Sequence, residues 1–152
     1  MDPVILGSIV GAIGAILGGF LGAWFIALRD DRRRQADHKA AVRAVLVELM
    51  GNVVVFDACL QAGSARTLAV SRDAYVSLLT PLYSGQMPGA LATELGRAYG
   101  RLVLVESAGE TVRFELMQQA APLCREAADH LMEYATSTLK MKFPGGPGLM
   151  EG

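Results

Sequence analysis

The chain begins with an unbroken apolar run, which decides what the rest of it can be. Residues 4–28 contain no charged side chain. At about 1.5 Å per residue, a helix of this length crosses a hydrocarbon core of about 30 Å with some tilt. Asp2 is suited to cap the first free amides of such a helix, and Pro3 suits its first position. We therefore expect a transmembrane helix over residues 1–28.

A cleaved signal peptide is the main alternative for this run. No Lys or Arg precedes the run, which is also longer than the usual apolar region of a signal peptide. In addition, no clear small-x-small cleavage site precedes the arginines that follow. These features favour a span that stays in the chain.

A basic segment, residues 29–41, follows the apolar run. Residues 29–43 hold six basic and three acidic side chains, and positive charge beside a span favours the cytoplasmic side. We expect a single-pass protein of the cell membrane, with its N-terminus outside and its C-terminal domain in the cytoplasm. Four arginines are predicted to set this topology and to contact anionic lipid headgroups, at about 1 kcal/mol each: Arg29, Arg32, Arg33 and Arg34. In a ring of spans, the same charge would also line a vestibule that favours anions.

Small residues in the apolar run fall on one side of the expected helix. At about 100° per residue they form two adjacent stripes, and the bulky side chains occupy the other half of the cylinder. In lipid, helices attract each other through close backbone approach, which small residues permit. The sequence therefore predicts a glycine-zipper interface between copies of the chain, made by Gly7, Gly11, Gly14, Gly18 and Gly22 together with Ser8, Ala12, Ala15, Gly19 and Ala23.

The double width of this predicted interface suits contact with two neighbours. Contacts of that kind close into a ring of three or more copies. Because Ser8 is the only polar side chain of the span, a conducting lumen would have to be narrow, gated or lined by glycine backbone.

The helix is expected to continue beyond the membrane as far as Gly63. The chain of 152 residues has room for one modest domain beside the anchor, and we place a cytoplasmic helical domain at residues 42–142. No helix breaker precedes Gly51, and glycine favours the position just past a helix end. A 3.6-residue apolar period predicts one buried face, made by Val42, Val45, Leu46, Leu49, Val53, Phe56 and Leu60.

Shorter helices are predicted after Thr67, so the fold class is all-α, with one transmembrane helix that continues into a helical bundle. Ser71 is a candidate N-cap, and Pro81 with residues 84–89 marks a break and a turn. A brief interruption is expected at residues 107–109, and the last helical stretch should reach Lys142, with Pro122 either kinking one helix or starting another. Residues 143–152 are rich in Gly and Pro and predict a flexible tail.

The sequence offers little for chemistry, and we expect no enzyme, no catalytic residue, no metal and no cofactor. Glu126, Asp129, His130 and Glu133 share a helix face, but a di-iron bundle needs a second such set, and the other histidine, His38, lies near the membrane. A solvated charged face is the simpler interpretation. Cys59 and Cys124 do not have the spacing of a zinc or redox motif and are expected to be reduced, apolar-facing fillers. A pI near 6.1 argues against nucleic-acid binding.

The layout also resembles a group of uncharacterised bacterial and phage-borne single-span membrane proteins with a cytosolic helical domain. The resemblance covers Val42 to Val105, through VLVELMGN and the later LATELGRAYGRL. It implies a bacterial inner membrane and a role in interaction, and it implies no activity.

Two functions remain open on the sequence alone. The first is a homo-oligomeric membrane protein, channel-like or membrane-perturbing, whose partners are its own copies and the lipid bilayer. The alternative is a membrane-tethered adaptor whose cytoplasmic domain docks a protein partner, with the glycine face recruiting a helix of another membrane protein. The glycine stripes favour the first function.

Overall fold

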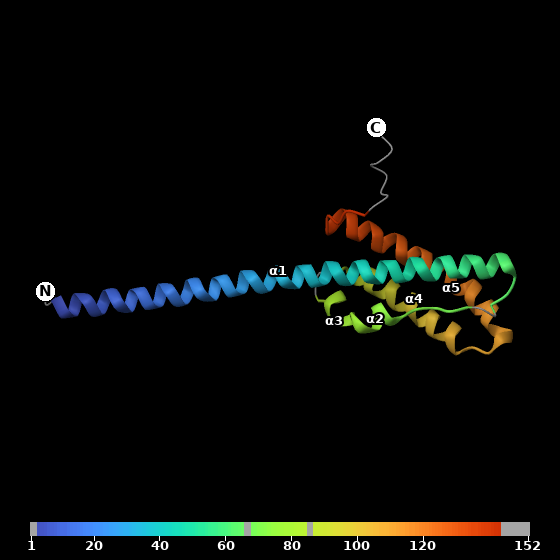
Figure 1. The fold of residues 1–152 in the computed structure, drawn as a ribbon, viewed down its shortest axis with the longest axis horizontal. Helices are drawn as coiled ribbons and strands as arrows, with labels where there is room; N and C mark the ends of the chain where they lie inside the picture. The colour runs from blue at the N-terminus through green and yellow to red at the C-terminus, as the bar shows by residue number, and fades with distance from the viewer. Residues whose placement is uncertain (1–2, 66–67, 85–86, 144–152) are drawn as a thin grey trace, which may run out of the picture. The chain divides into compact units, whose positions relative to one another are not determined.

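The protein is helical throughout the part that the structure describes. The computed structural model describes residues 3–65, 68–84 and 87–143, with side chains described from Leu21 onward apart from Thr111. These residues contain no strand, which confirms the all-α prediction. In chain order (Figure 1), the elements are α1 (Pro3–Ala62), α2 (Asp73–Ser77), α3 (Leu79–Leu82), α4 (Gly89–Ser107), α5 (Glu110–Glu133) and a π-helical turn η1 (Tyr134–Thr138).

Helix α1 ends where the sequence predicted. Gly63 follows its last residue with φ at 63°, a conformation that glycine adopts without steric cost. The amide of Gly63 donates to the carbonyl of Leu60 at 3.2 Å, and the amide of Ser64 donates to that of Cys59 at 3.1 Å. These two bonds make a Schellman motif, which satisfies carbonyls that would otherwise be unpaired at the helix end.

Contacts divide the chain into two units, residues 1–36 and residues 37–152. In the first unit, residues 21–36 are all exposed. Within the part with described side chains, α1 is the one helix that is long and apolar enough to cross a membrane by length and composition. A signal sequence near an N-terminus has the same length and composition. On these properties, α1 is a candidate span.

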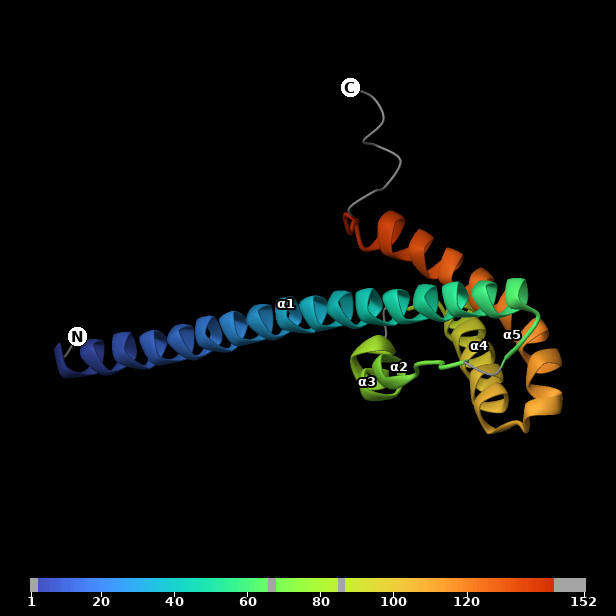
Figure 2. The ribbon, with the colours of Figure 1, turned by 45° about the vertical axis from the view of Figure 1, so that its right-hand side comes forward.

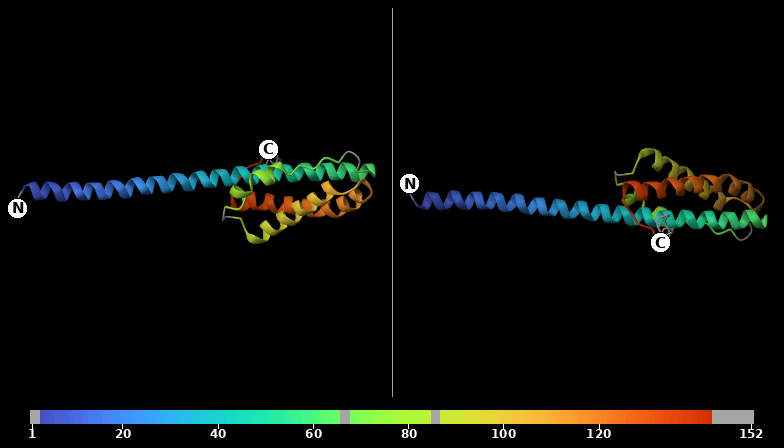
Figure 3. Two further views of the ribbon diagram at one scale, coloured as in Figure 1. Left: turned by 90° about the horizontal axis from the view of Figure 1, so that it is seen from below. Right: turned by 90° about the horizontal axis from the view of Figure 1, so that it is seen from above.

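The second unit has its own apolar core, and α4 and α5 pack along each other within it (Figures 2 and 3). The apolar period predicted for α1 is confirmed, since each of its seven members is buried or half-buried. Burying a Leu or Phe side chain contributes about 1.5 to 3 kcal/mol. Among the largest fully buried side chains of this core are Leu46, Leu49, Phe56, Leu95, Leu102, Met117 and Leu131.

The breaks predicted before α4 and between α4 and α5 are confirmed, but Pro81 lies inside the short helix α3 and does not itself mark a break. Helix α4 starts directly after Pro88. One cap is also not where the sequence placed it. Arg72 occupies the N-cap position of α2, but its side chain makes no hydrogen bond to the first turn of the helix. The prediction of Ser71 as the N-cap is therefore wrong. The amides in the first turn of α2 donate instead to Glu48 of α1.

Helix α5 continues through Pro122, so this residue does not start a new helix. Figure 2 shows α5 bending along its length, as expected for a helix with an internal proline. The helical stretch ends at Thr138, and the prediction that it reaches Lys142 is wrong. Lys140 has φ at 52°, and the amide of Leu139 bonds the carbonyl of Tyr134, five residues back, which gives a π-helical end.

The predicted flexible tail falls on residues that lie outside the described part, apart from Phe143. The ring of Phe143 lies against the guanidinium of Arg43, with 5.8 Å between the guanidinium carbon and the ring centroid. This cation–π contact places the last described residue beside α1.

Candidate functional site

The predicted glycine-zipper interface lies in α1. Of its ten residues, the structure describes the surroundings of Gly22 and Ala23, which are both exposed. Apart from its two chain neighbours and the backbone of its own helix, no atom lies within 4 Å of the position that a Cβ would take on Gly22. The remaining eight belong to α1, and their surroundings lie outside the described part. The interface stays a prediction.

The four predicted topology residues, Arg29 and Arg32 to Arg34, are all exposed. Nearby, the amide nitrogen of Gln35 donates to a carboxylate oxygen of Asp31 at 3.2 Å. An exposed guanidinium can donate several hydrogen bonds to a phosphate group. The role of these arginines as headgroup contacts stays a prediction.

A second exposed surface lies on the bundle part of α1, on the side away from the core. Every exposed residue of α1 between Arg43 and Gln61 is apolar or glycine. The exposed fractions are 64% for Val47, 49% for Met50 and 67% for Val54. We call this surface the outer stripe, and its members are Val47, Met50, Gly51, Val54 and Ala58. The apolar period that predicted the buried face of α1 did not predict this exposed surface.

Glu48 is the polar centre of the bundle. Its carboxylate accepts hydrogen bonds from the amides of Ala74 at 2.8 Å and Tyr75 at 3.2 Å, in the first turn of α2. It also accepts from the hydroxyls of Ser71 at 3.0 Å and Tyr99 at 2.7 Å. A carboxylate at a helix N-terminus is favoured by the dipole as well as by the bonds. Glu48 thus caps α2 from another helix.

Tyr99, which bonds this carboxylate, belongs to a group of three tyrosines in contact. The rings of Tyr75 and Tyr99 are stacked, with 3.8 Å between their centroids and 6° between their planes. The hydroxyls of Tyr75 and Tyr83 lie 2.9 Å apart. Burial raises the pKa of Tyr99, and the hydrogen bond to Glu48 raises it further. Burial likewise raises the pKa of Tyr83, with a further contribution from the hydrogen bond to Tyr75. These phenols stay protonated and serve as hydrogen-bonding groups.

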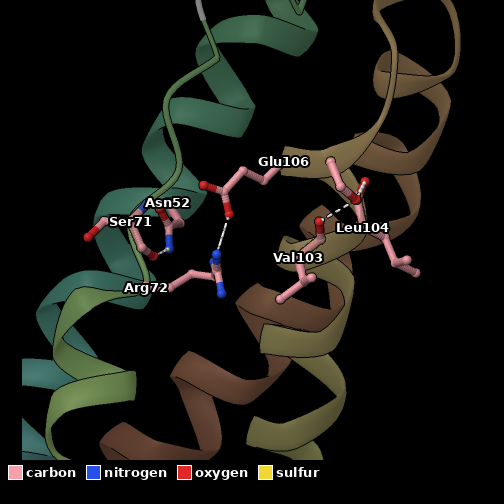
Figure 4. Close-up of polar contacts among 7 residues, drawn as sticks. Asn52, Ser71, Arg72, Val103, Leu104 and Glu106 are labelled. Carbon is pink, nitrogen blue, oxygen red and sulfur yellow. Dashed lines mark hydrogen bonds and ion pairs between the residues drawn. The ribbon is translucent and has the colours of Figure 1, made fainter.

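Asn52 holds the chain that leads into α2. Its side-chain amide donates to the carbonyl of Ser71 at 2.8 Å, and its oxygen accepts from the amide of Ser71 at 2.9 Å. Figure 4 shows this pair beside the contact of Arg72 with Glu106 of α4, which is an ion pair of 2.6 Å. The connection between α1 and α2 is therefore bonded to α1 through Asn52 and to α4 through Glu106.

His38 is fully buried and makes two hydrogen bonds. Its Nδ1 lies 2.9 Å from the carbonyl oxygen of Pro81, and its Nε2 lies 3.0 Å from the hydroxyl oxygen of Tyr134. Because a carbonyl can only accept, Nδ1 is the donor. In the neutral ring, Nε2 then accepts from Tyr134. From the sequence, His38 was expected only to lie near the membrane.

His130 lies on the exposed charged face that the sequence predicted, since its neighbours Glu126, Asp129 and Glu133 are exposed as well. Its Nδ1 lies 2.7 Å from a carboxylate oxygen of Glu94, which links α5 to α4. This hydrogen bond raises the pKa of His130, and the charges of Glu94, Glu126 and Glu133 act in the same direction.

A shallow opening of about 260 Å³ lies beside this pair, lined by residues that include Leu91, Tyr134 and Ser137. Among the residues that the structure describes, no group of three His, Cys, Asp or Glu side chains is placed to hold a metal ion. The pair therefore connects two helices and presents no assembled ligand set.

Both cysteines are buried, as expected for apolar-facing fillers, and both carry free thiols. Burial raises the pKa of Cys124 to about 12. A thiol that stays protonated is a poor nucleophile and a poor metal ligand. Cys124 therefore offers no reactive thiol.

Searches of protein families, of curated proteins and of solved structures found no match to this chain. The function must therefore be argued from the residues themselves.

Proposed function

We propose that this protein is a single-span membrane protein that assembles with copies of itself through the Gly/Ala face of α1. One observation supports the proposal above the others. The small residues belong to a helix that begins at Pro3 and continues to Ala62, so their three- and four-residue spacing corresponds to a face of a helix. A face of this kind allows close approach of a second helix in lipid.

The test is the mass of the full-length protein in mild detergent, measured by light scattering with the detergent contribution removed. We expect a defined mass of several copies. Replacing Gly14 and Gly18 with Leu should lower that mass to one copy, because two isobutyl groups would separate the helices. The matched control replaces Ile13 and Ile16, on the bulky half of the helix, with Leu and should keep the oligomer. A monomeric natural protein would overturn the proposal.

The subunit number then directs the next experiment. A ring of three or more copies would make an ion-flux assay in vesicles the direct test of a channel-like function. A dimer would leave no room for a lumen on a common axis.

Retention of the apolar segment separates a span from a signal sequence. We expect the intact mass of the protein from membranes to include residues 1–28. A mature chain that starts near the arginines would overturn the membrane anchor and, with it, the proposed assembly.

The second candidate function is the membrane-tethered adaptor, and the outer stripe favours it. Val47 and Val54 are the kind of exposed apolar residues that mark docking surfaces on helical domains. An adaptor would carry its partner there, and the glycine face would recruit a helix of another membrane protein. A monomeric mass together with a stable complex with a second protein would support this function.

A further inference from the structure

The lysines of the chain gather at one end of the second unit. Lys39 belongs to α1, whereas Lys140 and Lys142 follow η1, near the other end of the sequence. The contact of Phe143 with Arg43 brings the two segments together, with 5.8 Å between the ring centroid and the guanidinium carbon. Because Arg43 lies one turn after Lys39, the two side chains share one side of α1. We call these cations the basic patch, and its members are Lys39, Arg43, Lys140 and Lys142.

The bundle leaves the basic patch without a neutralising partner. All of its side chains are exposed, and none of them forms an ion pair with a residue that the structure describes. Asp37 lies two residues before Lys39, which places it on the opposite side of the helix. The patch therefore presents positive charge to whatever lies beside it.

A surface of opposite charge lies on α5, on the side of the helix away from the core. Its members are exposed and follow each other at intervals of three and four residues: Glu126, Asp129 and Glu133. Their carboxylates form no ion pair and no side-chain hydrogen bond with other described residues, since His130 beside them is bonded by Glu94 instead. We call these carboxylates the acidic face.

The basic patch and the acidic face begin at a similar level of the bundle. Nε2 of His38 lies 3.0 Å from the hydroxyl oxygen of Tyr134. Lys39 directly follows this histidine, and Glu133 directly precedes this tyrosine. The first cation of the patch and the last carboxylate of the face therefore have similar heights along α1.

The order of the charges along the two helices also matches. A second link between α1 and α5 is the ion pair of Asp57 with Arg125, at 2.6 Å. This ion pair joins a later residue of α1 to an earlier residue of α5 than the histidine contact does, so the helices run in opposite directions. One turn further from the histidine contact, α1 carries Arg43 and α5 carries Asp129. The cations of α1 thus correspond to the carboxylates of α5 in height and in spacing.

We propose that the basic patch of one copy of this chain lies against the acidic face of a second copy. The inference rests on the proposed function, because assembly in the membrane keeps the copies side by side and raises their effective concentration. A rotation about an axis parallel to the bundle part of α1 leaves every residue at its height. Surfaces of equal height in neighbouring copies can therefore meet.

Charge complementarity is the reason for choosing a second copy as the partner. The chain itself supplies a surface that fits the basic patch in sign, spacing and level. Opposite charges favour this contact, whereas two basic patches or two acidic faces would repel each other. Because single exposed ion pairs contribute little in water, the contact orients copies that are already assembled.

The test is zero-length carbodiimide cross-linking of the full-length protein in mild detergent at low salt. The reagent joins a lysine amine to a carboxylate in contact with it. Since every lysine of the chain belongs to the basic patch, a lysine-linked dimer reports on this surface. We expect a covalent dimer on a denaturing gel, with its link mapped by mass spectrometry to the acidic face. The dimer should decrease several-fold in about 1 M salt, where the Debye length is about 3 Å.

Removal of the acidic face should remove the link. The triple variant Glu126→Gln, Asp129→Asn and Glu133→Gln should give several-fold less covalent dimer than the natural protein. The substituted side chains are exposed, so the fold should be retained. Glu115→Gln is the matched control, because Glu115 is an exposed glutamate of the same helix, and it should leave the amount of dimer unchanged.

The mass measurement separates the two proposals. An oligomeric mass with a link from the basic patch to the acidic face, lost in the triple variant, supports the inference. An oligomeric mass without that link, or with a dimer that the triple variant forms equally well, overturns it. That result would leave the assembly through glycine intact and assign the lysines to anionic lipid or to another protein. A monomeric mass overturns the proposed assembly and the inference together.

Discussion

His38 of α1 and Tyr134 of η1 meet edge to face inside the bundle, with 3.0 Å between Nε2 and the phenol oxygen and 78° between the rings. The two residues are 96 positions apart in the chain. The other ring nitrogen of His38, Nδ1, donates to the carbonyl oxygen of Pro81. One imidazole therefore joins the start of the bundle, its short helix α3 and its C-terminal end.

Tyr134→Phe should destabilise the bundle. The substitution keeps the ring but leaves Nε2 of His38 buried without this partner, which costs about 1 to 3 kcal/mol. Urea unfolding of the full-length protein in mild detergent, followed by near-UV circular dichroism, measures the loss. Tyr83→Phe is the control and should cost less, because Tyr83 and its partner Tyr75 are only half-buried. Equal losses would show that the contact with His38 has no special weight.

Glu48→Gln should also destabilise the bundle, by about 1 to 3 kcal/mol. The amide replaces one carboxylate oxygen with a donor, so that donor faces groups that themselves donate. Asp57→Asn is the matched control, since it alters an exposed ion pair with Arg125 and should cost at most about 1 kcal/mol. The same urea titration compares both variants. If Glu48→Gln lost no more than Asp57→Asn, the capping of α2 would be energetically unimportant.

The contact of His130 with Glu94 should make stability depend on pH. Glu94 raises the pKa of His130 in the folded chain, so the folded state holds that proton more tightly than the unfolded state does. The contribution is complete below the unfolded pKa of about 6.5 and disappears as pH rises through the higher folded value.

Melting temperatures test this pH dependence. Glu94→Gln should lower the melting temperature at about pH 5.5 and have less effect at about pH 8.5, where the imidazole is neutral. Glu115→Gln, an exposed glutamate elsewhere on α5, should show no such difference. A larger effect of Glu94→Gln at the higher pH would contradict the assignment.

Replacement by alanine should have opposite effects on stability at two glycines. Gly63→Ala should cost about 1 to 2 kcal/mol, because φ at 63° is unfavourable for a residue with a Cβ. Gly96→Ala should stabilise the protein by up to about 1 kcal/mol, since Gly96 is an exposed residue within α4 with open space around it. Urea unfolding measures both. Stabilisation by Gly63→Ala would be inconsistent with the helix end described here.

Local rules predicted the helices well where the signal was itself local. The apolar period of α1, the glycine after its end and the break that follows α3 each depend on neighbours within a few residues. His38 and Asn52 carried a weaker signal. Both fall on the apolar period of α1, so a polar residue on a buried face could have been expected to have a buried partner.

Two interactions were not predicted because the partner is distant in the sequence, and one helix end was misplaced because it was predicted from composition. Ser71 was predicted to cap α2 because it precedes that helix, yet Glu48 of α1 bonds its amides. The last helical stretch was predicted to reach Lys142 from composition, yet it closes at Thr138 with a π-helical turn. The partners of His38 could not be predicted either, because nothing near it in the sequence indicates Tyr134.

The capping of α2 by Glu48 also implies an order of events during synthesis. A helix of five residues is too short to persist alone in water. Its acceptor is made 26 residues before the first amide that it bonds, so Glu48 leaves the ribosome before Ala74 does. The earlier helix therefore serves as the template on which the later one forms, and α2 is expected to lose its structure first whenever α1 is displaced.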